Sequence, residues 1–375
     1  MNTPGIRAAR YLKSLAVCGG DSVAAVGYAE QRQREWNDYS VVQALRQKSA
    51  VGGLEAGSVG SSDIQADLLA AVRPLTLAGR MPLRRVPSKV WMLTQVTGAV
   101  ARWIGEGAAR KLSAGVYARE LLRLKHVAAL TVASNEHLQN ATVEGDTALL
   151  ADLIAACVQA LDLAFIARSN AGDDATPAAI TAGTAPIAAL GDTIADVDES
   201  LRLAVAALVA AGSNLTAAYW TMSPQLAAAM ALTRGSGGAP AFPEIGALGG
   251  RLAGLPVLTS GVVEFDSDGA SDIALIDASQ VSIAEDPPEL RTSGEVLVEM
   301  DTAPTGDSTT PAAASQNRVS MFQSECTALM AGFRANWKLR RPGCVQVISG
   351  VMSPKANLLM QVSGRSEERR VGKEC

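Results

Sequence analysis

The chain has 375 residues and 48% of them are apolar, so it can bury a sizeable core in one large domain or a few smaller ones. Its formal net charge of −4 and pI near 5.4 argue against a generally basic nucleic-acid-binding protein. Aromatic residues make up only 4%, which disfavours base-stacking platforms, and two histidines leave little room for a histidine-rich metal site.

The first 75 residues are predicted to form an N-terminal arm or adaptor. Residues 6–50 indicate polar helices, and residues 52–62 (GGLEAGSVGSS) have the composition of a flexible loop. Residues 67–77 are apolar and end around Pro74. No compact core of its own is evident in this part.

Residues 81–134 predict a long hairpin with a glycine-rich tip. Residues 90–97 have an extended pattern, and the apolar run 127–134 (VAALTVAS) favours a buried strand. The charge is strongly one-sided, because residues 80–125 hold ten Lys or Arg against Glu106 and Glu120, a net charge of +8.

The middle of the chain contains the clearest helix, at residues 146–168, where apolar residues recur at helical spacing. A second helix is expected over 196–211, ended by Gly212. Residues 219–222 predict a buried strand, and Ser223 with Pro224 predicts the start of a helix over 225–233. Its large apolar positions are expected to be Leu226, Met230 and Leu232.

Further short strands are expected at 255–258, 273–276 and 345–351, with a longer one over 319–337. Loops are expected at 169–191, 235–250 and 301–316. Residues 173–310 hold 19 acidic residues against four basic ones, a net charge of −15. The basic hairpin is therefore followed by an acidic region, and complementary surfaces of this kind suit self-assembly.

No catalytic, cofactor or metal site is predicted. His126 and His137 are better explained as structural or surface residues than as catalysts. The glycine clusters at 235–238 and 249–250 match neither the GxxxxGK[ST] nor the GxGxxG phosphate-binding motif. The acidic pairs, at 173–174, 266/268 and 285–286, lack the spacing of known metal-ligand motifs. The five cysteines are far apart and form no CxxC motif, which fits a reducing cytosol. Gly212 and Pro224 divide the longest uncharged stretch into pieces that are too short to span a bilayer. We therefore expect a soluble protein that is not an enzyme.

The order of several short segments resembles the major capsid protein family of tailed double-stranded DNA bacteriophages, whose fold also builds encapsulin shells. Together these segments cover roughly residues 65–351. They are 85–87 (RVP), 97–107 (TGAVARWIGEG), 130–138 (LTVASNEHL), the helix 146–168, 218–224 (AYWTMSP), 249–257 (GGRLAGLPV), 281–286 (VSIAED) and 337–343 (WKLRRPG).

This resemblance implies an α+β fold with an N-terminal arm over 1–75 and an extended loop over 85–128. A peripheral domain would comprise 129–186 plus 316–351, with the long helix as its spine, and an axial domain would comprise 187–315. The chain would assemble in the host cytoplasm into pentamers and hexamers of an icosahedral head that encloses double-stranded DNA. Candidate partners are a portal, a scaffold and a maturation protease. No association with a membrane is expected.

The candidate functional residues are inter-subunit contacts on the extended loop, namely Arg102, Glu106, Arg110, Lys111 and Arg119. The sequence around Lys111 does not match the motif of those family members that crosslink covalently. Two alternatives stay open, an encapsulin-like compartment shell and, less favoured, a soluble enzyme with an unrecognised site.

Residues 365–375 (RSEERRVGKEC) look like the translation of a common sequencing adapter that begins AGATCGGAAGAGCG. The segment is charged and lacks apolar periodicity. We expect it to be an artefact, so Cys375 would have no role.

Overall fold

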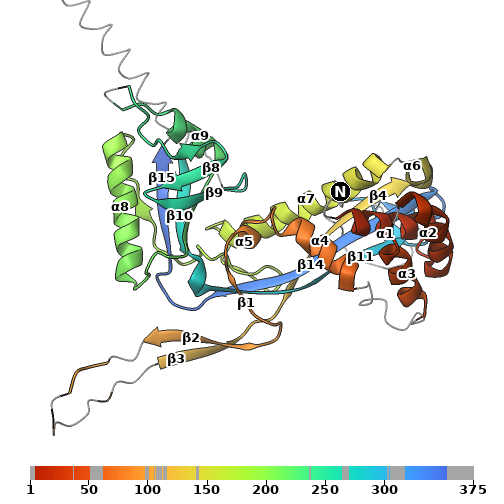
Figure 1. Cartoon of the computed structure of the whole chain (residues 1–375), viewed down its shortest axis with the longest axis horizontal. Coiled ribbons are helices and arrows are strands. Elements are labelled where there is room, and N and C mark those ends of the chain that lie inside the picture. Colours follow the sequence, from red (N-terminus) through yellow and green to blue (C-terminus); the bar gives the residue numbers. More distant parts are fainter. Residues whose placement is uncertain are drawn as a thin grey trace, which may run out of the picture. The chain divides into compact units, whose positions relative to one another are not determined.

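The computed structural model describes residues 5–36, 38–50, 62–97, 101–104, 106, 112, 116–140, 143–235, 238–263, 270–301, 304 and 317–352 (Figure 1). Most of the expected loops at 52–62 and 301–316, and all of residues 365–375, lie outside these ranges. The chain forms two compact units. Unit 1 is built from residues 1–76, 126–160 and 286–334, and unit 2 from 77–125, 161–285 and 335–375.

Unit 1 begins with four helices, α1 (Ile6–Val17), α2 (Ser22–Trp36), α3 (Ser40–Ala50) and α4 (Ser62–Val72). The expectation that this part has no compact core of its own is wrong. Alanine and leucine side chains at helical spacing are fully or nearly buried between the helices, while the charged residues lie mostly outside. The buried set includes Ala8, Leu12, Leu15, Val42, Leu45 and Leu68. An ion pair of 2.9 Å between Arg7 and Asp38 links α1 to the segment before α3.

A four-stranded sheet has the order β1-β11-β14-β4, from β1 (Arg84–Arg85), β11 (Val281–Ser293), β14 (Cys326–Leu339) and β4 (Lys125–Ser134). The prediction of a buried strand at 127–134 is wrong, because β4 is an edge strand whose side chains alternate between partly buried and exposed. Our sequence analysis also missed β11, whose Pro287 and Pro288 argue against a strand.

Unit 1 also contains α6 (Asn135–Asn140), the first part of α7 (Val143–Ile166) and a two-stranded ribbon of β12 (Leu297–Glu299) and β13 (Arg318–Ser320). The expected single strand over 319–337 is therefore two strands. The chain turns between β13 and β14, where Glu325 has a φ of 51°. The long helix is confirmed, and its buried residues include Leu153, Ile154, Cys157 and Phe165.

Unit 2 is centred on a seven-stranded sheet with the order β5-β15-β10-β6-β9-β8-β7. Its strands are β5 (Ile187–Ala188), β6 (Ala218–Met222), β7 (Ile245–Gly246), β8 (Gly249–Leu252), β9 (Leu255–Thr259), β10 (Ala270–Asp277) and β15 (Val345–Met352). The predicted strands at 219–222, 255–258, 273–276 and 345–351 are confirmed. The C-terminal strands divide between sheets, because β14 lies in the four-stranded sheet and β15 in the seven-stranded one.

Two helices of unit 2, α8 (Ile194–Ala210) and α9 (Pro224–Leu232), pack on this sheet, and the short helix α5 (Leu77–Arg80) and a 3-10 turn at Ala278–Gln280 complete it. The predicted start of α9 is confirmed, because the Ser223 hydroxyl accepts a hydrogen bond of 3.3 Å from the Leu226 amide. Leu226 and Met230 are buried as expected. Leu232 differs, since it ends the helix and is 69% exposed.

Candidate subunit-contact surface

The predicted hairpin is a separate two-stranded ribbon of β2 (Trp91–Thr97) and β3 (Val116–Leu121) (Figure 1). The strands are antiparallel, with Trp91 opposite Leu121 and Leu93 opposite Arg119. Met92 points to the other face of the ribbon and is buried in a small cluster with Leu122 and Ala284. One face of the hairpin base is thus attached to the rest of unit 2.

The opposite face carries a stripe of large apolar side chains that the chain itself leaves exposed. Trp91, Leu93 and Tyr117 are 52%, 60% and 56% exposed, and the Arg119 guanidinium carbon lies 4.4 Å from the centroid of a Trp91 ring. We call these four residues the hairpin stripe. A contiguous apolar surface joined to a cation is typical of a protein–protein contact. An isolated two-stranded ribbon is also marginally stable in water, so it gains from being covered.

The predicted contact residues are only partly placed by the structure. Arg119 belongs to the hairpin stripe, and Arg102 and Glu106 are exposed in the connection between the two strands. Arg110 and Lys111 lie outside the described residues. Trp91, Leu93 and Tyr117 were not among the predicted contact residues, although the alternation of Trp91 and Leu93 along an extended segment was a signal for one exposed face.

Part of the positive charge of residues 80–125 is used inside unit 2. Arg85 forms an ion pair of 2.5 Å with Glu285, and Arg80 donates to the Thr259 carbonyl at 2.6 Å. The Lys125 ammonium donates to the Asp173 and Thr176 carbonyl oxygens. These contacts fix the base of the hairpin, so only the remaining cations face outward for a partner.

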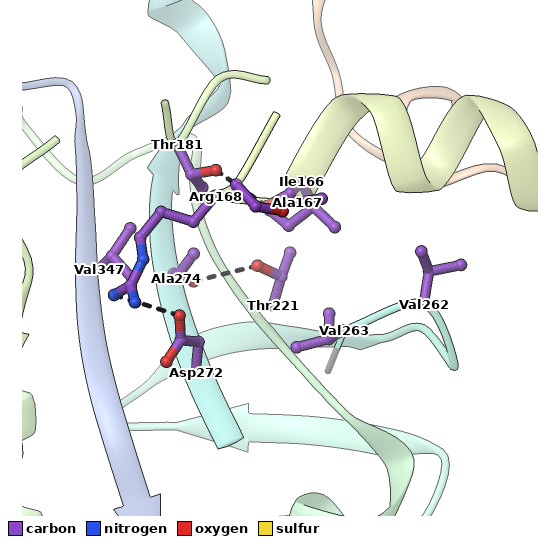
Figure 2. A pocket seen from close by; sticks show the side chains of 11 residues that line it. Ile166, Ala167, Arg168, Thr181, Thr221, Val262, Val263, Asp272, Ala274 and Val347 are labelled. Atoms are coloured by element: carbon purple, nitrogen blue, oxygen red, sulfur yellow. Dashed lines mark hydrogen bonds and ion pairs between the residues drawn. The ribbon is translucent and has the colours of Figure 1, made fainter. Parts of the chain in front are cut away.

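Unit 2 also contains a cavity of about 230 Å³ between the end of α7, β10 and β15 (Figure 2). Four of its polar side chains form hydrogen bonds or ion pairs within the chain. The Thr221 hydroxyl donates to the Ala274 carbonyl at 3.3 Å, the Thr181 hydroxyl to the Ile166 carbonyl at 2.8 Å, and Arg168 pairs with Asp272 at 3.4 Å. The rest of the lining is mainly apolar, and the lining residues present no nucleophile next to a base.

In the described part of the chain, no group of three or more His, Cys, Asp or Glu side chains could hold a metal ion. His126 lies on β4 with its ring close to Gly332. Among the described residues, no helix is both long enough and apolar enough to cross a membrane.

One buried carboxyl group joins three segments of unit 2. Asp162, near the end of α7, is 3% exposed and accepts hydrogen bonds from the Leu77 amide at 2.8 Å and from the Ser260 hydroxyl at 3.2 Å. Burial raises the pKa of this carboxyl to about 6, although the two hydrogen bonds and nearby Arg80 oppose the shift. Asp162 thereby attaches the start of α5 and the end of β9 to α7.

We expect the Asp162→Asn variant to be more stable than the wild type at pH 7.5 and equal to it near pH 4. The pKa in the folded chain lies above the ordinary aspartate value, so folding favours the protonated form, and the wild type loses stability as pH rises through 6. The difference should reach up to about 3 kcal/mol, because one pKa unit corresponds to about 1.4 kcal/mol. The asparagine Oδ1 can accept from the Leu77 amide, and its Nδ2–H can donate to the Ser260 hydroxyl oxygen in place of the bond that the carboxylate accepts.

Urea unfolding of unassembled protein at several pH values measures this difference. Asp198→Asn, on the exposed side of α8, controls for the loss of one negative charge. A pH-independent difference between Asp162→Asn and the wild type would show that the Asp162 carboxyl does not titrate as proposed.

The sequence and the fold both match known capsid proteins. The family model described as "Phage capsid family" matches residues 72–349. A relative from Pseudomonas phage PAJU2, named "Capsid polyprotein", is 32% identical over 365 residues. That match covers 93% of this chain and 54% of the relative, so the chain spans about half the length of the curated relative.

Solved structures with a similar fold come from phage and from a particle called GTA. The structure titled "Capsid of native GTA particle computed with C5 symmetry" is 19% identical, with a TM-score of 0.51 over 74% of this chain and 90% of that chain. A chain from Mycobacterium phage Bobi is 17% identical, with a TM-score of 0.53 over 72% of this chain and 88% of that chain. At this identity the likeness establishes the fold, which is the α+β fold expected from the resemblance.

Proposed function

The chain belongs to the phage capsid family, and we propose that it is the major capsid protein that self-assembles into the icosahedral head around the double-stranded DNA of a tailed phage or prophage. The observation that carries this proposal is the hairpin stripe. Four residues of one ribbon face away from their own unit, and an apolar surface of this kind is stabilised when a neighbouring subunit covers it.

We assign a separate place in the shell to the extended loop, to the peripheral domain and to the axial domain. The hairpin lies across an adjacent subunit, residues 129–186 and 316–351 form the peripheral domain, and residues 187–315 cluster at the fivefold and sixfold axes. The N-terminal helices are packed elements of the subunit, because their buried leucines would meet water if they detached. A portal, a scaffold and a maturation protease are proposed partners, and assembly takes place in the host cytoplasm.

An encapsulin-like shell is the second candidate, because it would share the fold. The curated relative is named as a phage capsid polyprotein, which favours the phage assignment for this chain. The content of purified particles separates the two functions, since a compartment shell would contain a cargo protein and a phage head would contain DNA.

Negative-stain microscopy and sedimentation of the full chain, expressed in a bacterial host, test the proposal. We expect closed particles of uniform diameter, or rings of five and six copies that convert to them. A protein that stays monomeric at every protein and salt concentration, alone and together with the neighbouring genes of its locus, would overturn the capsid function.

A further inference from the structure

One edge of the seven-stranded sheet in unit 2 ends in a tight hairpin with an exposed leucine at its tip. β7 and β8 pair Gly246 with Gly249, so only Ala247 and Leu248 connect them, and Leu248 is 94% exposed. Gly250 has a φ of 139°, and a Cβ there would collide with the Glu244 carbonyl oxygen. The close backbone approach holds the tip rigidly, although Leu248 adds nothing to its own core.

The same edge carries further unpartnered groups. Leu232 at the end of α9 is exposed, and α9 lies against β7. Arg234 and Arg251 are exposed, and neither pairs with a carboxylate among the described residues. We call these residues, with Leu248, the leucine edge. It combines apolar area with two arginines, and with the exposed Glu244 directly before β7 its net charge is +1.

The opposite edge of this sheet has the opposite charge. The sheet order places β5 at the other end from β7, and α8 packs on β5 and β15. Figure 1 shows α8 beside β15, whereas α9 lies on the side of β8 and β9. Residues 190–202, which comprise the segment before α8 and the first half of that helix, hold four acidic residues against one basic, a net charge of −3.

The outward side of α8 combines small, apolar and charged side chains. Val197, Leu201 and Leu208 are buried against the sheet, while Asp198 and Ala206 are exposed on the other side. Arg202 between them is also exposed, but its charge is paired with Glu199 at 2.5 Å. Val209 near the end of the helix is half exposed. The acidic residues at the start of α8 could be explained by their favourable interaction with the helix dipole alone. The dipole does not explain the exposed Val209, which lies at the other end of the helix.

We propose that the leucine edge of one copy packs on the outward side of α8 of the next copy, so that the seven-stranded sheets join head to tail in a ring. The two edges differ in charge, and pairing each edge with itself would bring like charges together. A two-fold contact is therefore disfavoured, and a heterologous contact generates rings when its rotation closes. The inference rests on the proposed capsid function and assigns a contact within it.

The first test is the Leu248→Ser variant. Its melting temperature should equal that of the wild type, because Leu248 is outside the core, while the yield of rings and closed particles should fall at least tenfold. Leu163→Ser, an exposed leucine on α7 away from both edges, should assemble normally. Normal assembly of Leu248→Ser would overturn the proposed contact.

The second test separates a heterologous contact from the alternatives. A chain with both Ala247→Cys and Ala206→Cys keeps Leu248 and, treated with a short bis-maleimide, should give a ladder of covalent oligomers up to the ring size. Each variant with only one of the two added cysteines should stay monomeric on a denaturing gel, as should the wild type with its native cysteines. Dimers from a single variant would indicate a two-fold contact and overturn the proposal.

Microscopy of the same samples distinguishes two kinds of failure. Shells that form without a ladder contradict the head-to-tail contact and leave the capsid function intact. An absence of shells from the wild-type chain under every condition contradicts the capsid function, and the ring contact falls with it.

Discussion

Replacing Trp220 by alanine is expected to lower the free energy of unfolding by about 3–5 kcal/mol. Trp220 lies on β6 between β10 and β9, is 0% exposed, and packs in the core that α8 and α9 cover. Its indole Nε1–H donates to the Leu252 carbonyl at 3.0 Å. The substitution therefore leaves a large cavity and a buried carbonyl without this donor, and both effects destabilise the fold.

Trp103 supplies the matched control, because it is fully exposed in the connection between β2 and β3. Trp103→Ala should change the free energy of unfolding by less than about 0.5 kcal/mol. Urea unfolding of the unassembled variants, followed by far-ultraviolet circular dichroism, gives both values. A Trp220→Ala variant with the wild-type midpoint would mean that β6 is not at the centre of this core.

The elements that sequence analysis identified correctly are those with local causes. Ser223 and Pro224 define the start of α9. The Ser223 hydroxyl caps a free backbone amide of the first turn, and the fixed φ of Pro224 matches that of a helix. The apolar spacing in 146–168 defines α7 because one helical face must be buried. Such signals depend on residues a few positions apart.

The errors concern elements whose environment is set by distant parts of the chain. The first three helices looked too polar for a core, yet their alanines and leucines are buried, and α1 packs against α2, α3 and α4. β4 has the composition of a buried strand but lies at a sheet edge, which only the sheet order determines. β11 contains two prolines and is nevertheless paired along part of its length, as with Arg84 and Arg85 of β1.

The candidate contact surface was predictable in charge but not in detail. The excess of Lys and Arg in 80–125 is visible in the sequence, whereas the use of Arg85 and Lys125 inside unit 2 requires the fold. The hairpin stripe depends on the strand register, which places Arg119 opposite Leu93 and next to Trp91. Composition does not specify a register.

Reversing Arg102, Arg110, Lys111 and Arg119 together to glutamate should abolish closed particles and leave the subunit folded. Each reversal changes the charge by −2, so the net charge of residues 80–125 falls from +8 to 0. The proposed partner is the acidic stretch 173–310 of a neighbouring copy, with its net charge of −15. The attraction that orients the hairpin on that surface would be lost.

A graded series separates charge from side-chain shape. Glutamine at the same four positions leaves a net charge of +4, so it should give fewer particles than the wild type and more than the reversed variant. Wild-type assembly should itself weaken as salt rises, because the screening length falls from about 10 Å at 0.1 M to about 3 Å at 1 M. Light scattering and negative-stain microscopy at both salt concentrations measure these effects. If the reversed variant builds normal shells at low salt, the apolar residues Trp91, Leu93 and Tyr117 hold the hairpin to its neighbour without electrostatic help.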